Sequence, residues 1–356
     1  MDFYQKILLL LIIILSCLIL FEFYRKYYLT ASTKFREPFG FNTIANEYEN
    51  VSTSDISTKV QSTPSKYDEI SISQFVIKGS YNSAFTGNHM NLEMIEYLLS
   101  RGCRYLDFEV FYIQEDDIFK AVVACSNDPT FSTLKSDNYL LLDDVFTTIN
   151  SYAHSFTTPN RQDPLFVNLR IKSNDTNVYP VVAKSVHEHL KSNLVESKVT
   201  NDTLFKEIKK KIVLVVDKTI HRNYKEYHDC NDKQKTCIKL KHFVNLESGS
   251  DKLNLIRYNE IFEQKPIPIM TRDDNITTNV NYMKLVVPDL LNDNLYNPSL
   301  NDLVIRYGAQ IVPFCFYKKD IQLDNYEEFF NDNHSSFVPL GTAIAHFKKL
   351  NDLENE

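Results

Sequence analysis

The sequence predicts an α/β protein in which one barrel of alternating strands and helices follows an N-terminal transmembrane helix. Three observations lead to this prediction. An apolar run occupies Ile7–Phe21. About 290 residues remain after the N-terminal region, a length that suits one barrel better than two small domains. From about residue 69 onwards, short β-like runs alternate with helical stretches, the pattern of a parallel βα architecture.

The first 29 residues (1–29) are predicted to anchor the protein in a membrane as a single-pass helix. Only Ser16 and Cys17 interrupt the apolar run, and aromatic residues between positions 23 and 28 extend it towards the membrane interface. More Lys and Arg residues follow the run than precede it, which places the barrel on the cytosolic side. A cleaved signal peptide, with Ala31 near the cleavage position, is the alternative interpretation.

Residues 30–68 are polar, rich in Ser, Thr and Asn, and lack a sustained periodicity, so they are predicted to be a tether. Beyond the tether, strands are expected at Phe75–Lys78, Arg104–Val110, Leu165–Ile171, Ile212–Val216, Lys284–Val287 and Ile311–Phe316. Helices are expected at Asn91–Ser100, Asp143–Ala153, Val181–Leu194 and Pro298–Tyr307. The polar segment 219–264 interrupts this alternation. Within it, Cys230 and Cys237 bracket a loop and could form a local disulfide in an oxidising compartment.

Composition excludes several classes of function. The chain has 39 Lys and Arg against 46 Asp and Glu, a formal net charge of −7. No basic face dominates, so the protein is not expected to bind nucleic acid. The six cysteines form no pair of CxxC elements and no cluster with histidine, so a structural zinc site is not expected.

Two acidic residues are the first candidates for a functional site. Asp107 and Glu109 lie two apart in a predicted strand, so both project from one face of it, while the apolar residues beside them face the other way. In a barrel the apolar side packs on helices, and the carboxylates point inward near the end of the strand where barrel active sites form. With the side-chain carbonyl of Asn82 they would offer three oxygen ligands for calcium. Taken on the residues alone, the alternative is an internal salt-bridge network.

Several stretches, in the same order, resemble the catalytic barrel of eukaryotic phosphoinositide-specific phospholipase C. Phe75–Gly87, Gly102–Phe111 and Pro164–Arg170 look like the X half of that barrel, and Gly308–Phe316 and residues 324–340 look like its Y half. The resemblance implies a distorted TIM (β/α)8 barrel of the phospholipase C-like phosphodiesterase type. Its parts would be an X-like half at 69–218, an X/Y linker insertion at 219–264, a Y-like half at 265–345 and a C-terminal tail at 346–356.

The resemblance also implies a calcium site with four ligand positions. In this chain Asn82, Asp107, Glu109 and Arg170 hold those positions, so a guanidinium stands where the family has a glutamate. Because arginine pairs bidentately with carboxylates, Arg170 is predicted either to bridge Asp107 and Glu109 in place of the cation or to point past the strand end into solvent. Calcium is therefore expected as a cofactor only if the site is still functional, and otherwise no cofactor is expected.

The catalytic positions that the resemblance implies have also changed. Tyr81 stands where the family has its first catalytic histidine, and Cys125 or Ser126 stands in the position of the second. A tyrosine with a pKa near 10 is a poor general base at neutral pH. Of the basic residues that hold the substrate phosphate in the family, Lys218 is the one candidate counterpart. No catalytic residue is therefore predicted to be retained.

Three functions follow as hypotheses. The first is a membrane-anchored, catalytically degenerate phosphodiesterase, a pseudoenzyme that binds a phosphoinositide, an inositol phosphate or a protein partner. The second is an active phospholipase C with rebuilt acid–base groups drawn from Tyr81, Cys125 and His89. The third is a structural membrane protein that uses the barrel as a rigid body.

Overall fold

The computed structural model describes residues 38–354 apart from residues 55, 116, 229–236, 265–269, 273–274, 278–281 and 290–295. The predicted anchor at residues 1–29 lies outside these residues. Among the helices that are described, none is both long and apolar enough to span a bilayer. The chain divides into two compact units, residues 1–47 and residues 48–356, and the second unit contains the barrel.

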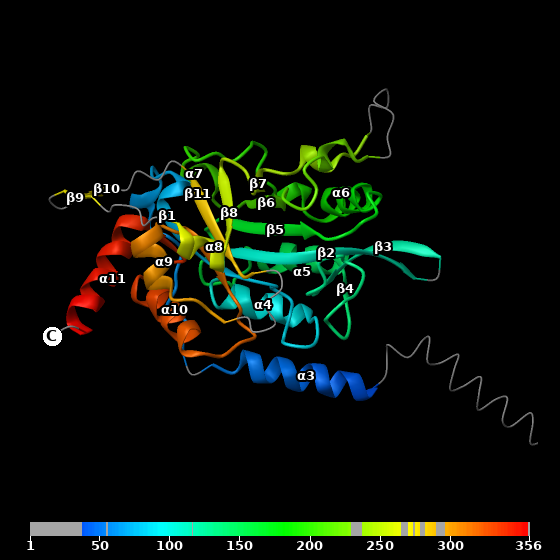
Figure 1. Ribbon diagram of the computed structural model, residues 1–356, viewed down its shortest axis with the longest axis horizontal. Helices are drawn as coiled ribbons and strands as arrows, with labels where there is room; N and C mark the ends of the chain where they lie inside the picture. Colours follow the sequence, from blue (N-terminus) through cyan, green and yellow to red (C-terminus); the bar gives the residue numbers. More distant parts are fainter. Residues whose placement is uncertain are drawn as a thin grey trace, which may run out of the picture. The chain divides into compact units, whose positions relative to one another are not determined.

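Within the described part of the second unit, eight parallel strands close into a barrel (Figure 1). β12 pairs with β1, and β1 pairs with β2 through Gly79 and Ser80, which completes the ring. The predicted (β/α)8 type of barrel is therefore confirmed. The strands follow one another around the ring in sequence order: β1 (Phe75–Ser80), β2 (Tyr105–Glu115), β5 (Leu165–Ile171), β6 (Ile212–Asp217), β7 (Leu246–Ser248), β8 (Leu253–Arg257), β11 (Met283–Val287) and β12 (Ile311–Phe314).

The four predicted helices are present, with ends that differ by a few residues from the predicted ones. They are α4 (Leu92–Ser100), α5 (Leu142–Tyr152), α6 (Val178–His189) and α9 (Leu300–Tyr307). Local signals define their ends: the Asn91 side chain accepts a hydrogen bond from the backbone of Glu93 at the start of α4, and Gly308 ends α9 with a φ of 59°.

Further elements lie around the ring. β3 (Ile118–Ala124) and β4 (Leu140–Leu141) extend β2 as an antiparallel ribbon that projects beyond the barrel in Figure 1. β13 (Phe337–Pro339) pairs antiparallel with β1. The remaining elements are α3 (Pro38–Ser52), α7 (Phe205–Ile208), α8 (Tyr258–Glu263), the hairpin of β9 (Met270–Arg272) and β10 (Asn275–Thr277), α10 (Ile321–Asp332) and α11 (Leu340–Glu354).

Two apolar cores lie on the two faces of the barrel wall. The inner core fills the barrel with alternate strand residues such as Phe75, Phe166 and Val215. The outer core lies between the strands and the helices and includes Leu106 and Phe108 of β2. This alternation is the physical reason why Asp107, between two outward-facing residues, points into the barrel.

The segment 219–264 differs from its prediction as a linker, because it supplies two strands of the ring, β7 and β8. These strands are short and contain polar residues such as Glu247 and Asn254, so they lack the apolar runs by which the other strands were predicted. A loop that contains Gly249 joins them directly, with no helix between them. Cys237 is disulfide-bonded, and Cys230 lies outside the described residues.

The segment 30–68 also differs from its prediction as a polar tether. Part of it forms the helix α3, and residues 53–64, here called the strap, are bound along the second unit. The Asn331 side chain accepts from the backbone N–H of Lys59 at 2.8 Å and donates to the Ser57 carbonyl at 3.1 Å. Further along, the Thr63 N–H and hydroxyl both donate to Asp163, at 2.8 and 2.9 Å. The amino-acid composition did not indicate that residues 53–64 are bound, because backbone groups of the strap make most of the contacts.

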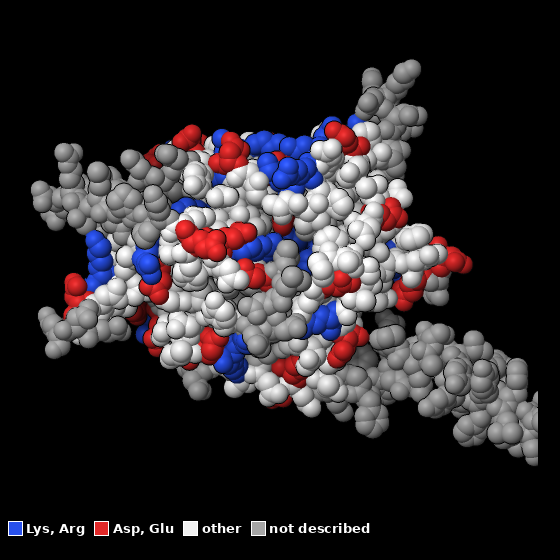
Figure 2. Space-filling model, in the orientation of Figure 1, with Lys and Arg blue, Asp and Glu red and all other residues white. Residues whose placement is uncertain are grey.

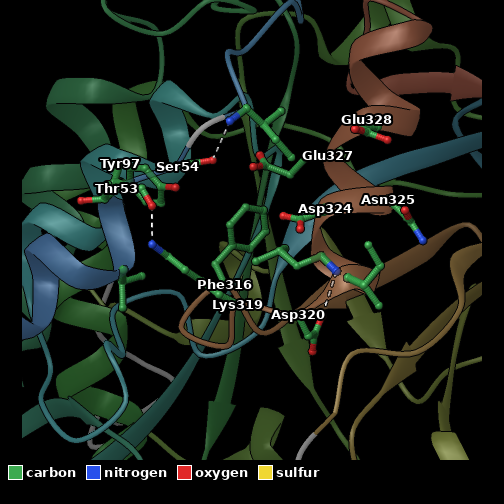
Figure 3. A pocket seen from close by; sticks show the side chains of 14 residues that line it. Thr53, Ser54, Tyr97, Phe316, Lys319, Asp320, Asp324, Asn325, Glu327 and Glu328 are labelled. Atoms are coloured by element: carbon green, nitrogen blue, oxygen red, sulfur yellow. Dashed lines mark hydrogen bonds between the residues drawn. The ribbon is translucent and has the colours of Figure 1, made fainter.

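One cavity lies where the strap passes α4 and α10. Its volume is about 560 Å³, and Figure 3 shows Thr53 and Ser54 of the strap facing Asp320, Asp324 and Glu327. Lys319 crosses it to donate to the backbone carbonyl of Thr53. The cavity therefore lies between the first residues of the strap and the first turns of α10, on the outside of the barrel and away from the inward-facing side chains of β2.

Candidate functional site

The candidate site is built on the inner face of two neighbouring strands. β2 and β5 pair in parallel, with Asp107 opposite Asn168 and Glu109 opposite Arg170. Side chains alternate along a strand, and Phe166 belongs to the inner core, so Asn168 and Arg170 point into the barrel beyond it. The four polar side chains therefore meet inside the barrel near the carboxyl ends of the strands, where barrel active sites form.

Arg170 uses every N–H of its guanidinium within this group. Nε donates to both carboxylate oxygens of Asp107, at 3.0 and 3.1 Å. Nη2 donates to Asp107 Oδ2 and to Asn82 Oδ1, each at 2.6 Å. Nη1 donates to Glu109 Oε1 at 2.8 Å and to the Tyr81 hydroxyl at 2.9 Å. An arginine has five such N–H groups, so the guanidinium is fully bonded between the two carboxylates. Of the two predicted arrangements, the structure has the bridge.

A second cation, Lys172, completes the group. It lies two residues beyond Arg170, on the same face of the chain, and its Nζ is 2.9 Å from Glu109 Oε1. It also donates to the Ser126 carbonyl at 3.1 Å. Asn168 donates to Asp107 Oδ1 at 2.8 Å. Sequence reasoning missed Lys172 and Asn168, although the two-residue spacing from Arg170 would have identified both.

The charges of this group balance inside the barrel. The side chains of Asp107 and Arg170 are each 1% exposed and that of Glu109 is 2% exposed. Burial by itself would raise the pKa of Glu109, but the charges of Arg170 and Lys172 outweigh it and hold the pKa below its usual value. Burial by itself would lower the pKa of Arg170, but the charges of Asp107, Tyr81 and Glu109 outweigh it and raise the pKa well above its ordinary value. Two carboxylates and two cations thus form a neutral, closed network.

The Tyr81 side chain contacts Arg170 through both its hydroxyl and the face of its ring. Its hydroxyl accepts from Arg170, and the guanidinium carbon lies 4.3 Å from the centre of its ring, a cation–π contact. Burial raises the pKa of Tyr81 above its usual value of about 10. A phenol in this state cannot take a proton from a substrate hydroxyl at neutral pH.

Asn82 is positioned by a strained backbone. Its φ is 46°, in the left-handed region that asparagine tolerates better than most residues. Its N–H donates to Asp107 Oδ2 at 3.2 Å, its side-chain carbonyl accepts from Arg170, and its amide donates to the Cys125 sulfur at 3.3 Å. The oxygen predicted as a calcium ligand is therefore bound to a guanidinium.

Cys125 and Ser126, the candidates for the second catalytic position, are both buried. Burial raises the pKa of the Cys125 thiol above its ordinary range, so the thiol stays protonated. The Ser126 backbone N–H donates to Glu109 Oε2 at 2.9 Å, and its hydroxyl donates to the Thr133 carbonyl. His89 lies 3.6 Å from Asp137, outside the network of Arg170.

Lys218, the predicted phosphate-binding residue, is half-buried just after β6. Its N–H donates to the Ser248 carbonyl at 3.1 Å, and its charge interacts with Glu247 and Asp251. Glu247 faces outward, because Leu246 before it belongs to the inner core. The contacts of Lys218 therefore do not connect it to Arg170, and its role in binding phosphate stays a prediction.

The donor set does not fit calcium in this arrangement. The fourth ligand position that the resemblance implies holds Arg170, and its guanidinium lies between Asp107 and Glu109. Among the described residues, no group of three or more His, Cys, Asp or Glu side chains could hold a metal ion elsewhere. In this arrangement the carboxylates of Asp107 and Glu109 are bonded to cations of the chain and are almost fully buried, so neither is exposed as a base or a metal ligand.

The chain was compared with known proteins. Residues 69–218 match the family described as "Phosphatidylinositol-specific phospholipase C, X domain". Among solved structures, PLC21 of L. pealei aligns with a TM-score of 0.53 at 14% identity, over 78% of this chain and 39% of that one. PLC21 of S. officinalis gives 0.51 at 14% identity, over 78% and 38%. No curated protein matches the sequence significantly. The likeness to the solved structures establishes the fold, and this chain spans about two fifths of their length.

Proposed function

We propose that this chain, whose residues 69–218 belong to the X-domain family of phosphatidylinositol-specific phospholipase C, is a membrane-anchored, catalytically inactive barrel. One observation carries the proposal: the Arg170 guanidinium lies between Asp107 and Glu109 and is fully hydrogen-bonded there. A cation that is covalently part of the chain cannot be exchanged for calcium, so no Lewis acid would polarise a substrate phosphate at this position.

The acid–base groups support the same proposal. Cleavage of a phosphodiester by attack of a neighbouring hydroxyl needs a general base and a general acid that work near neutral pH. Tyr81 and the Cys125 thiol both have raised pKa values because they are buried. The alternative of an active enzyme with rebuilt groups would therefore need a base from outside this network. Phosphoinositides, inositol phosphates or a protein partner are proposed as ligands, not as substrates.

Hydrolysis assays test this proposal directly. The purified protein is incubated with vesicles that contain phosphatidylinositol or its phosphorylated forms, with calcium or with a chelator. We expect release of inositol phosphates at the background rate in both conditions, since loss of two acid–base groups removes roughly 10² to 10⁴ in rate for each. An active family member in the same vesicles is the positive control. Calcium-dependent release that disappears in an Asp107→Asn variant would establish an enzyme.

Anchoring is tested separately. Carbonate extraction of membranes should leave the full-length protein in the pellet and release a variant that starts at Ser32, because an apolar run such as Ile7–Phe21 inserts into the hydrocarbon core. A mature N-terminus near Ala31 would identify a signal peptide instead and would remove the anchor from the proposal.

A further inference from the structure

The connection between β6 and β7 departs from the βα pattern of the barrel. In a regular barrel a helix covers the outer face after each strand. Here the described residues of the connection form only two short 3-10 turns, Tyr224–Glu226 and Leu240–His242. Residues 218–242 carry seven Lys or Arg against three Asp or Glu, a net charge of +4 in a chain of net charge −7. Positive charge is therefore concentrated along a connection whose described residues form no covering helix.

Lysines from neighbouring segments join this connection on the outer side of the barrel. The Lys198 ammonium donates to the carbonyls of Lys241 and Val244. Figure 2 shows Lys and Arg side chains gathered in the upper part of the view, over the region where Figure 1 labels β6 and β7. We name this surface the lysine flank and define it by its exposed and partly exposed lysines, Lys198, Lys218, Lys225, Lys241 and Lys252.

Acidic residues neutralise only part of the flank. Lys225 pairs with Glu247 at 2.6 Å, and Lys252 pairs with Asp251 at 3.0 Å. Within the described residues, Lys198 and Lys241 lie within ion-pair distance of no carboxylate. Among the described residues of the connection, Glu226 is the one acid against Lys218, Arg222, Lys225, Lys239 and Lys241, so this surface keeps an excess of positive charge.

The pKa values of two groups, Lys198 and His242, are lowered by burial and by the positive charges around them. The pKa of Lys198 is lowered by burial and then by the charge of Lys225. The pKa of the exposed His242 is lowered by burial and by the charges of Lys241, Lys239 and Lys198. A lysine and a histidine at different places on the flank thus both sense a positive potential. The lysines therefore lie close enough together to act as one charged surface.

We infer that the lysine flank docks on the surface of an anionic lipid bilayer. The choice of a bilayer over another polyanion rests on the proposed anchoring, because an anchored chain is held within reach of anionic headgroups. Each lysine near such a surface adds a favourable term to the binding free energy. Because these terms add, a net charge of a few units is sufficient for reversible docking. The flank is on the side of the barrel, so docking would lay the barrel along the membrane. The closed network of Arg170 would then not face the lipid.

Amide hydrogen exchange of the full-length protein in vesicles tests this inference. The protein is reconstituted in vesicles of phosphatidylcholine alone or of phosphatidylcholine with added phosphatidylserine. We expect exchange of the amides in residues 237–248 to slow by at least about fivefold in the anionic vesicles, the factor that corresponds to one lysine. High salt should abolish the difference, because it screens exposed charges.

Two pairs of substitutions supply the matched controls. Lys218→Gln with Lys241→Gln removes two partly exposed lysines of the flank, and exchange in anionic vesicles should return to the rate in neutral vesicles. Lys348→Gln with Lys349→Gln removes two lysines of α11 and should leave the slowing unchanged. Melting temperatures of both variants should match wild type, which shows that they are folded.

Failure of this inference and failure of the proposed anchor give different results. A protein without an anchor does not float with neutral vesicles, yet the flank would still carry it with anionic vesicles at low salt. Equal exchange rates in the two kinds of vesicle, or loss of the slowing in the α11 variant, would overturn the inference. Stronger protection of residues 237–248 by a soluble RNA than by anionic vesicles would also overturn it, because the partner would then be a nucleic acid.

Discussion

Removal of Arg170 tests whether this residue replaces a metal ion as the cation of the barrel. In an Arg170→Ala variant, Asp107 keeps Asn168 and Glu109 keeps Lys172, but two carboxylates then face each other with one cation and almost no access to water. Breaking a buried ion pair by removal of one partner costs about 3–5 kcal/mol. We expect a loss of this size, which lowers Tm by roughly 5–15 °C in a domain of this size.

The surface pair Lys120–Glu115 provides a matched control. Its ammonium and carboxylate are 2.7 Å apart but 33% and 45% exposed. Lys120→Ala should therefore cost less than about 1 kcal/mol. A further variant, Arg170→Glu, adds a third carboxylate and should be less stable than Arg170→Ala in a chelator. It should be partly rescued by millimolar calcium, because three carboxylates and the Asn82 oxygen then form an oxygen site.

Thermal melts with calcium and with a chelator measure both effects. The reasoning fails if Arg170→Ala is as stable as wild type, since the guanidinium would then not hold the carboxylates together. It also fails if calcium raises the Tm of the wild type, because a cation site would then be open beside Arg170.

Three further predictions concern other buried polar groups. Burial raises the pKa of Asp163 to about 6, above its unfolded value near 3.9, so its protonation stabilises the folded state at low pH and this contribution is lost as pH rises through about 6. Denaturant titrations from pH 4 to 7 should show wild type losing roughly 3 kcal/mol relative to Asp163→Asn; parallel curves would contradict this. The Glu327 carboxylate accepts hydrogen bonds from Lys78 and Arg101 at 3.1 and 2.9 Å, and its side chain is 4% exposed. Glu327→Gln should therefore lower the free energy of unfolding by about 3–5 kcal/mol in the same assay. A loss below about 1 kcal/mol would show that solvent compensates for the missing charge. Asn331→Ala removes both hydrogen bonds to the strap and should cost about 1–3 kcal/mol, with faster proteolysis between residues 53 and 64; unchanged cleavage would show that the strap is held by its other contacts.

The parts of the fold that could be predicted are those with long apolar runs. Leu165–Ile171 is buried at every position, because the inner core covers one face and the helices cover the other, and its predicted bounds were correct. β7 and β8 were missed for the opposite reason, since Glu247 and Asn254 point to a partly polar exterior. Where the outer residues of a short strand are partly exposed, they no longer need to be apolar, and a sequence pattern cannot separate the strand from a loop.

The sequence predicted most residues of the candidate site, but it did not predict how their charges are balanced. Alternation along β2 placed Asp107 and Glu109 together, and the pairing chemistry of arginine gave the bridge by Arg170 as one of two alternatives, between which the sequence did not decide. Lys172 was missed because it lies just beyond the predicted end of the strand at Ile171, although its two-residue spacing from Arg170 puts it on the same face. The predicted tether failed for another reason: polar backbone atoms of residues 53–64 bind side chains such as Asn331 that lie far away in the sequence.

Two cations built into the chain have a different consequence from one bound metal ion. A divalent ion can leave, and its exchangeable positions can bind a substrate oxygen. Arg170 cannot leave or lose its proton at accessible pH, and all its donors are bound to protein atoms. Together with Lys172 it neutralises Asp107 and Glu109 from within the chain, so the charges inside the barrel are balanced without a bound ion. If the barrel interior is closed in this way, as proposed, a surface that binds a partner lies elsewhere on the molecule, and the lysine flank, with its excess of positive charge, is the surface that we propose.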